Sequence, residues 1–329
     1  MQPAIERDPA ARAPAARGTE RIVHLNRVTK TFGRHVAVDD LTLTIPRGSV
    51  YGFIGPNGAG KTSTIRMIMH IHLADRGQVE VLGEPAGQRT ARRIGYLPEE
   101  RGLYPKMRVR DVILYFGRLK GRTRAELAPR IDEWLEKFGL TAWRLKKCQE
   151  LSKGMQQKVQ LIGTLLHEPE IVILDEPFSG LDPVNTRTVK DMMRELKREG
   201  RLIVLSTHQM DQVEELCDRI VMIDRGQRVL YGTVREIKKR YADEIRHATG
   251  RGNVVVVDGE GDFAAIEGVL KSEASGAALR LTLETDLAPD RYLERALFAG
   301  CSVSRFEASP TPLEEIFVHV VTKNGGVAA

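Results

Sequence analysis

The chain has 329 residues, of which 42% are hydrophobic and 29% are charged, and its formal net charge is +6. These values are ordinary for a globular protein, and the length accommodates one large domain and a smaller one, each with its own core. No run approaches the roughly 18 apolar residues needed to cross a bilayer, and the positive residues are scattered along the chain, which disfavours both a membrane-spanning protein and a nucleic-acid-binding protein.

The first residues and the cysteines bear on processing and location. Residues 1–20 are rich in Ala, Pro and Arg and lack the apolar segment of a secretory signal, so we expect a disordered lead-in. Cys148, Cys217 and Cys301 are far apart in the sequence and form no C-x-x-C pair. Neither a zinc site nor a disulfide framework is therefore indicated, and a reducing cytoplasm fits.

The first structured segment is predicted to be β-rich. Residues 22–54 contain several β-like stretches, and residues 41–45 alternate strictly between apolar and polar side chains. Such alternation is typical of a strand with one buried face. We expect a small antiparallel element in this segment.

A phosphate-binding loop follows. Residues 55–62 complete the pattern G-x-x-x-x-G-K-[ST] between an apolar strand-like segment and a helical segment. Glycines allow backbone N–H groups to converge on a polyphosphate, and the helix behind them adds its positive N-terminal dipole. Lys61 can reach the β- and γ-phosphates, and the Thr62 hydroxyl can ligate Mg²⁺. The candidate nucleotide-binding residues here are Gly55, Pro56, Asn57, Gly58, Ala59, Gly60, Lys61, Thr62 and Ser63.

Between residues 107 and 166 the hydrophobic period becomes helical, which predicts a helical insert. Thr123 and Glu126 could form a capping box, although Pro129 then lies inside the helix and implies a kink or a later start. Gly121 and Gly139 stand where C-terminal caps belong. The two apolar faces consist of Val109, Val112, Ile113 and Phe116, and of Leu127, Ile131, Trp134, Leu135 and Phe138.

Strands and helices then alternate. The apolar run at residues 171–174 is typical of a strand buried on both faces of a parallel sheet. A helix follows, with Asp182 as its N-cap, Pro183 at its first position and Gly200 beyond its end. A second apolar strand at residues 202–205 comes next. This order predicts a parallel α/β core.

Polar residues directly after these two strands are candidates for catalysis. Asp175 would hold Mg²⁺, and Glu176 could orient or deprotonate the attacking water. His208 could bond a γ-phosphate oxygen or that water, since ligands gather at the carboxyl ends of parallel strands. The alternatives are a solvated acidic turn for the two carboxylates and a purely structural histidine.

Beyond about residue 235 the pattern changes again and suggests a small separate domain. A basic helix is expected around residues 237–246, followed by strand-like pieces at 254–257, 279–283 and 302–306. A capping box at Thr311 and Glu314 predicts a final helix. Its apolar stripe, which needs a surface to cover, consists of Leu313, Ile316, Phe317, Val320 and Val321.

Over roughly residues 22–235 these motifs resemble the ATP-binding cassette (ABC) family, the nucleotide-binding subunits of ABC transporters. The resemblance implies an α/β fold of the P-loop NTPase type, with a mixed sheet core, an antiparallel β subdomain and a helical insert, plus a small α+β C-terminal domain. Its motifs match, in order, the A-loop aromatic Phe32 for adenine stacking, Walker A at 55–62, Glu99 at the Q-loop position, the signature at 151–155, Walker B at 171–176 with catalytic Glu176, the D-loop at 179–182 with Asp182, and the switch His208.

Two positions depart from the family pattern. Glu99 stands where most members carry glutamine; its carboxylate can still offer oxygen to Mg²⁺ but cannot donate a hydrogen bond. The signature, usually Leu-Ser-Gly-Gly-Gln, has Lys153 and Met155 in place of a glycine and the glutamine, while Ser152 and Gly154 remain. Ser152, Lys153 and Gly154 at the start of a helix can bind a phosphate, although Ser152 could be merely an N-cap.

The resemblance implies ATP and Mg²⁺ as ligands and an ATPase that drives transport. In this family the signature of one subunit closes over ATP held by another, so a single cassette implies a homodimer or a heterodimer with a second ABC subunit. The segment 97–105 and the appended domain resemble sodium or drug exporter ATPases, whose partner is an integral membrane permease docking near residues 100–145. We therefore expect a cytoplasmic protein, peripheral on the inner face of the membrane.

The alternative is a soluble ABC-type ATPase acting on nucleic acid or ribosomes. Those relatives carry long coiled-coil inserts or two cassettes, whereas this chain has one cassette and a short insert, so no nucleic-acid partner is expected. The expected division is a lead-in at 1–20, an ATP-binding domain at 21–235 with a helical subdomain at about 100–165, and a C-terminal accessory domain at 236–329. In the architecture that the resemblance implies, the substrate path belongs to the membrane subunit and not to the ATP-binding chain.

Overall fold

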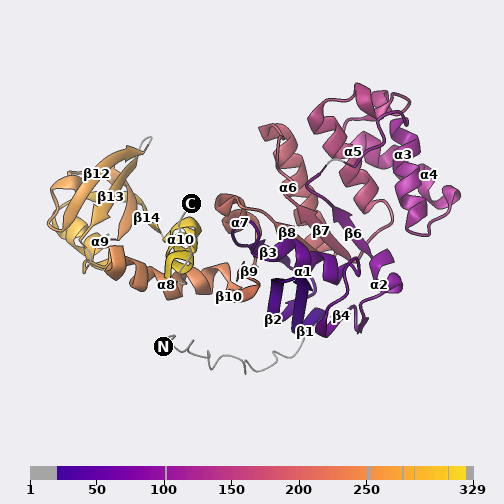
Figure 1. Cartoon of the computed structure of the whole chain (residues 1–329). Coiled ribbons are helices and arrows are strands. Elements are labelled where there is room, and N and C mark those ends of the chain that lie inside the picture. Colours follow the sequence, from indigo (N-terminus) through magenta and orange to yellow (C-terminus); the bar gives the residue numbers. More distant parts are fainter. Residues whose placement is uncertain are drawn as a thin grey trace.

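The computed structural model of the chain describes residues 21–100, 102–249, 253–275, 278–284, 286–309 and 311–323 (Figure 1). The predicted lead-in at residues 1–20 lies outside the described residues. Three sheets are present in the described part, two of them in the first two thirds of the chain and one near its C-terminus. Within the described residues, no helix is both long and apolar enough to span a membrane.

The first sheet is antiparallel, as predicted. Its strand order is β2-β1-β4-β5. The alternation at residues 41–45 sets its buried face, because Leu41, Leu43 and Ile45 are buried while the threonines between them are not. The strands are β1 (Arg21–Phe32), β2 (His35–Pro46), β4 (Arg76–Val81) and β5 (Glu84–Pro85).

The central sheet is mixed and has the order β10-β9-β3-β8-β7-β6. Neighbouring strands from β9 to β6 are parallel, and only β10 at the edge is antiparallel. The carboxyl ends of the parallel strands therefore meet at one edge. The strands are β3 (Val50–Ile54), β6 (Ile94–Leu97), β7 (Ile171–Asp175), β8 (Leu202–Ser206), β9 (Arg219–Asp224) and β10 (Gln227–Thr233).

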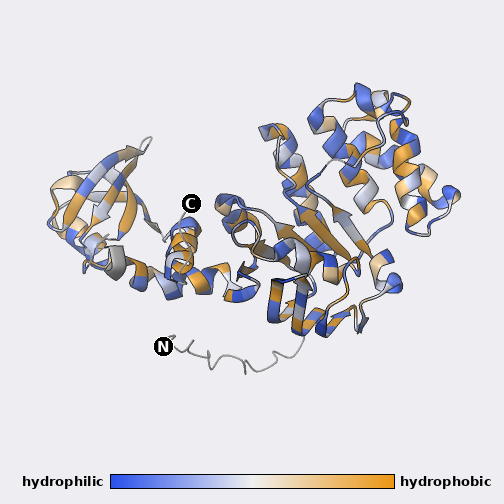
Figure 2. Ribbon diagram, in the orientation of Figure 1, coloured by the Kyte–Doolittle hydropathy of each residue, from blue (hydrophilic) through white to orange (hydrophobic). Residues whose placement is uncertain are grey.

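Both faces of the central sheet are covered, which explains why its strands read as continuous apolar runs. In β3, Val50 and Ile54 face one hydrophobic core, and Tyr51 and Phe53 face another. The second core is shared with the antiparallel sheet and α1 (Lys61–Ile68). The inner strands of the central sheet are correspondingly coloured mostly as hydrophobic in Figure 2.

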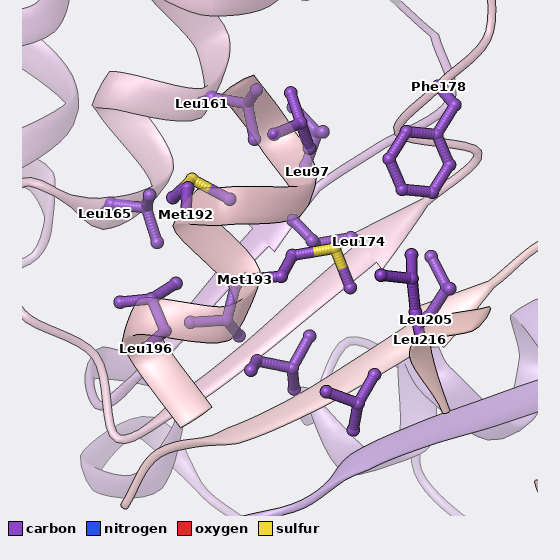
Figure 3. Close-up of a cluster of buried hydrophobic side chains, with 14 of the residues drawn as sticks. Leu97, Leu161, Leu165, Leu174, Phe178, Met192, Met193, Leu196, Leu205 and Leu216 are labelled. Atoms are coloured by element: carbon purple, nitrogen blue, oxygen red, sulfur yellow. The ribbon is translucent and has the colours of Figure 1, made fainter. Parts of the chain in front are cut away.

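Helices cover the face of the central sheet that lies opposite the antiparallel sheet. Figure 3 shows this core where Leu174 and Leu205 of adjacent strands lie near Met193 and Leu196. All four side chains are buried. The helices on or beside this face are α3 (Val109–Leu119), α4 (Arg124–Lys137), α5 (Lys153–Leu165), α6 (Pro183–Arg198) and α7 (Met210–Leu216); α2 (Gln88–Arg92) and 3-10 turns at Thr141–Trp143 and Cys148–Glu150 complete this part.

The helical insert forms with the predicted caps. The Thr123 hydroxyl accepts from the Glu126 N–H at 3.3 Å, and the Glu126 carboxylate accepts from the Thr123 N–H at 2.7 Å. Because this capping box closes the first turn, α4 begins directly after it and contains Pro129, so the later start that the proline suggested is wrong. Gly121 and Gly139 follow α3 and α4 with φ of 89° and 67°, as expected for glycines at helix ends.

The C-terminal sheet is antiparallel, with the order β12-β13-β11-β14 and a small core of its own. It stands apart from the central sheet in Figure 1, connected through α8. The predicted strand pieces lie in β11, β13 and β14, but β12 and α9 were not predicted, because β12 lacks a clear apolar alternation. The elements are α8 (Val234–Thr249), β11 (Val254–Glu260), the 3-10 turn Phe263–Ala265, β12 (Val269–Ser275), β13 (Ala278–Leu283), α9 (Pro289–Phe298), β14 (Ser302–Ser309) and α10 (Leu313–Lys323).

The apolar stripe of the last helix covers α7 and α8. Leu313, Ile316 and Val320 are buried in the same core as Ile237 of α8. At the start of α10 the Leu313 N–H donates to the carboxylate of Glu214 in α7. The capping box predicted at residues 311–314 would supply an acceptor for a backbone N–H at this helix start. In the structure, the Glu214 carboxylate of α7 supplies an acceptor there.

Candidate functional site

The carboxyl edge of the central sheet brings together segments that are far apart in the sequence. The phosphate loop follows β3, Asp175 and Glu176 end β7, and His208 follows β8. These three strands are neighbours in the sheet, in the order β3-β8-β7, and β6 beside β7 delivers Glu99 to the same edge. Parallel pairing therefore gathers the candidate residues at one place.

The phosphate loop needs glycine at two positions for geometric reasons. Gly55 and Gly60 have φ of 144° and 105°. A Cβ on Gly55 would lie 2.0 Å from the Ile223 carbonyl oxygen, and one on Gly60 would lie 2.3 Å from that of Ala37. Side chains at these positions would displace backbone, so the loop has room only for glycine there.

Lys61 is the first residue of α1 and folds back over this loop. Its Nζ donates to the carbonyl oxygens of Gly55 at 2.6 Å and Pro56 at 2.9 Å. Burial lowers the pKa of Lys61, and the nearby charges of Asp175 and Glu176 oppose that shift. The ammonium therefore lies in the field of the carboxylates at the end of β7, where a phosphate chain on the loop would also be within its reach.

The other loop residues differ in exposure. Asn57 and Gly58 are exposed at the tip, and Ala59 is buried, its carbonyl accepting from the Gly226 N–H at 2.9 Å. Thr62 is exposed and Ser63 half-buried in the first turn of α1. Thr62 is therefore open to a ligand at the helix start.

Phe32 lies at the end of β1, close to the loop. It pairs with His35 of β2, and two residues further along β2 the Ala37 carbonyl lies against Gly60. The ring is 44% exposed, with the Lys30 ammonium 5.4 Å from its centroid and the His72 ring edge-on to it at 5.3 Å. A large exposed aromatic beside a phosphate loop is suited to stacking on a base.

Asp175 is a buried carboxylate, 8% exposed. Burial raises its pKa and the neighbouring Glu176 adds to the rise, while a hydrogen bond with Ser206 opposes it. The Tyr96 hydroxyl also bonds this carboxylate, and burial followed by the charge of Asp175 raises the pKa of Tyr96 to about 12. A buried carboxylate with a raised pKa gains most from a nearby cation.

Glu176 and His208 are in direct contact. One Glu176 carboxylate oxygen accepts from the His208 N–H at 2.9 Å and from its Nδ1 at 2.7 Å, and the other accepts from the Thr207 hydroxyl at 3.0 Å. Glu176 has a φ of 47°, held by its N–H bond to the Ser206 carbonyl at 2.8 Å. The His208 side chain is 74% exposed, so its second nitrogen is open to a ligand.

Glu99 is exposed beyond the end of β6. It lines a cavity of about 30 Å³ together with Glu176, Gln157, Gln160 and neighbouring residues. Glu99 therefore lies near Glu176.

The signature residues lie at the start of α5. The Ser152 hydroxyl accepts from the Met155 N–H at 3.3 Å, which makes Ser152 the N-cap. Lys153 is exposed, and Gly154 faces Leu181 and Asn185 near the start of α6. The N-cap role does not exclude a phosphate contact, because a helix N-terminus can bind an anion as well.

Asp182 begins α6 as predicted, its carboxylate accepting from the Asn185 N–H at 2.9 Å. That backbone hydrogen bond is the main reason why the pKa of Asp182 is lowered. The contacts described above for Ser152, Gly154 and Asp182 lie within and between the starts of α5 and α6, and none of these contacts is with the phosphate loop.

Several contributors were not predicted. Thr207 fixes Glu176, and its position after β8 beside His208 was a usable signal. The sequence gives no such signal for Tyr96 and Gln157, because an aromatic residue in a strand and a glutamine in a helix are ordinary. Their roles depend on contacts between segments that only the fold brings together.

The oxygen donors at this edge fit Mg²⁺. The Asp175 carboxylate, the Thr62 hydroxyl and the Glu99 carboxylate are hard oxygen ligands of the kind Mg²⁺ prefers. In the residues that the structure describes, no group of three or more His, Cys, Asp or Glu side chains could hold a metal by itself. This set of protein ligands suits a cation whose other ligands are substrate phosphates and water.

Comparison with family models gives two extended matches. A model described as ABC transporter matches residues 38–179, and one described as ATP-binding protein DrrA1-3-like, C-terminal domain, matches residues 232–321. A third, described as AAA domain, putative AbiEii toxin, Type IV TA system, matches residues 147–212. The first covers the phosphate loop and β7, and the second covers the C-terminal sheet.

Individual relatives and a solved structure indicate the same family as the first match. The chain is 41% identical over 303 residues to the uncharacterized ABC transporter ATP-binding protein YhaQ of Bacillus subtilis, covering 90% of this chain and 97% of the relative. It is 35% identical to the Nod factor export ATP-binding protein I of Paraburkholderia xenovorans, covering 65% of this chain and 71% of the relative. A structure titled "Structure of ATP binding subunit of ABC transporter" matches with a TM-score of 0.62 and 30% identity, covering 67% of this chain and 93% of that chain.

Proposed function

The chain belongs to the ABC transporter ATP-binding proteins, and from this membership we propose that it is the ATP-hydrolysing subunit that powers a separate membrane-spanning exporter. The observation that carries the proposal is the meeting of the phosphate loop, Asp175, Glu176 and His208 at one edge of the parallel sheet. Binding of a nucleoside triphosphate alone would need only the loop.

Each residue has a distinct task in this proposal. Loop N–H groups and Lys61 bind the phosphates, and Phe32 stacks on the adenine. Mg²⁺, held by Thr62, Asp175 and Glu99, would neutralise charge on the β- and γ-phosphate oxygens.

Glu176 orients the attacking water and accepts its proton. Its hydrogen bonds to His208 and Thr207 fix the direction of the carboxylate. The exposed second nitrogen of His208 bonds the γ-phosphate or the water. These two residues thereby supply the hydrolytic step that the loop cannot.

Dimerisation is part of the proposal. Ser152 caps α5, whose first turn contains the exposed Lys153. Gly154 faces residues near the start of α6, and Asp182 is the N-cap of that helix. In the proposed dimer these residues close over ATP bound by a second cassette, either another copy or a similar ABC subunit. ATP stabilises the closed pair, and its hydrolysis releases it.

The proposed organisation and location follow from the same function. Residues 21–235 are the ATP-binding domain and residues 236–329 an accessory domain after a lead-in at 1–20. The protein lies in the cytoplasm against the inner face of the membrane, where the helical insert meets an integral membrane permease. Export is supported by the relative named for Nod factor export. No nucleic-acid partner is proposed.

The test is purification of the full chain from its native membranes in detergent. We expect co-purification with a polytopic membrane protein and magnesium-dependent ATPase activity. Salt-sensitive association with DNA or ribosomes, without a membrane protein, would contradict the transport role. Absence of ATPase activity in the complex with its membrane partner would contradict the assignment as a motor.

A further inference from the structure

Two buried glutamines from α5 extend toward the catalytic edge of the sheet. Gln157 and Gln160 are nearly fully buried, at 6% and 7% exposure. Glutamine is seldom buried unless its amide has partners, because an unpaired amide in the interior costs about 1–3 kcal/mol. Gln157 and Gln160 are therefore expected to have hydrogen-bond partners.

The Gln157 amide contacts the backbone directly after the catalytic glutamate. Its Nε2 donates to the Pro177 carbonyl oxygen. A carbonyl can only accept, so the nitrogen of the amide must face Pro177, and the oxygen must face the other way. One side chain of α5 thus holds the peptide that follows Glu176.

The other end of the amide is buried. Gln157 Oε1 has no hydrogen-bond partner among the described residues. The side chain also lines the cavity of about 30 Å³ that is lined by Glu99 and Glu176. The bond to the Pro177 carbonyl is therefore the contact through which Gln157 can act on Glu176.

We propose that Gln157 is a positioning residue for hydrolysis, holding Glu176 in place through its hydrogen bond to the carbonyl of the next residue, Pro177. This role rests on the proposed ATPase function.

The position of Gln157 on α5 gives the proposal its consequence. Ser152 is the N-cap of this helix, and Gln157 lies five residues further along the same rigid element. A shift of α5 when Ser152 meets a phosphate would therefore reach Glu176 through Gln157. Small displacements matter here, because misplacing a catalytic group by about 1 Å can cost roughly 10²-fold in rate.

The test compares Gln157→Met with a neighbouring control in the full chain. Methionine keeps the volume and removes the hydrogen bond to the Pro177 carbonyl. We expect kcat to fall about tenfold or more while KM and the affinity for a fluorescent ATP analogue stay within about twofold. The control is Gln156→Met, because Gln156 donates to the Cys148 and Leu151 carbonyls instead. It should keep kcat within about twofold.

A second variant covers the case in which Gln157→Met does not fold. Gln157→Glu preserves shape, and its carboxyl can donate to the Pro177 carbonyl only when protonated. The ratio of its kcat to that of the wild type should therefore fall as pH rises through the pKa of the new carboxyl. A pH-independent ratio would overturn the proposal, as would equal losses in the Gln156 and Gln157 methionine variants.

Wild-type protein without ATPase activity would refute the proposed function itself. An active wild type with an equally active Gln157→Met variant would refute only the role of Gln157.

Discussion

Replacing Glu176 by glutamine tests the catalytic site with little disturbance of the fold. The oxygen that accepts from the His208 N–H and Nδ1, at 2.9 and 2.7 Å, can be kept as the amide oxygen. The amide nitrogen then faces the Thr207 hydroxyl, which can rotate from donor to acceptor. We therefore expect the free energy of unfolding to change by less than about 1 kcal/mol.

The loss in rate should be far larger than the loss in stability. A positioned general base contributes roughly 10²–10⁴-fold, which corresponds to about 3–5 kcal/mol of activation free energy. Glutamine cannot accept the proton of water, so Glu176→Gln should lose this contribution. Alanine would be a poorer probe, because it also removes all three hydrogen bonds to the carboxylate.

Phosphate release measures the turnover of Glu176→Gln, and chemical denaturation measures its stability. ATP binding should persist, and size-exclusion chromatography with ATP should show a trapped dimer. The control is Glu195→Gln, whose carboxylate bonds Lys137 on the surface at 2.5 Å and should not affect kcat. A Glu176→Gln variant that keeps more than about a tenth of wild-type kcat would refute the assignment of the base.

Three further changes test other parts of the reasoning. Lys61→Ala removes a charged donor to phosphate and should weaken ATP binding about 10- to 100-fold in equilibrium titrations; unchanged affinity would contradict the role of Lys61. Glu99→Gln should change the ATPase rate without abolishing it, and complete loss would show that the carboxylate is indispensable. Burial, with a smaller effect of Lys120, lowers the pKa of His167 to about 4. Because the pKa of an unfolded histidine is about 6.5, unfolding takes up a proton between pH 4 and 6.5, so the free energy of unfolding falls as pH falls through this window. His167→Leu should remove up to about 3 kcal/mol of that pH dependence in urea titrations. An unchanged pH dependence would contradict the lowered pKa of His167.

Much of the fold could be predicted because local pattern and buried environment agree. The run at 171–174 is continuous because both faces of β7 are covered, and the alternation at 41–45 has one face in a core. Caps at Thr123 and Asp182 were readable because they act within one turn. Pro129 misled the prediction of the helix start, because the capping box outweighs one missing N–H.

The candidate site was predictable only in part. The loop, Asp175, Glu176 and His208 each follow a strand, so their meeting follows from parallel pairing. Contacts across elements left no local signal, as for Tyr96 against Asp175 or Gln157 against the Pro177 carbonyl. Such contacts are set by how α5 and β6 pack on the sheet.

The helices α8 and α10 pack against α7 of the ATP-binding cassette. Val213 and Leu216 of α7 lie in one hydrophobic core with residues of α8 and α10. The Glu214 carboxylate accepts from the Leu313 N–H of α10 and from Lys238 of α8 at 2.5 Å. Because α7 begins two residues after His208, α8 and α10 stabilise the helix that follows this histidine, while the C-terminal sheet has a separate core.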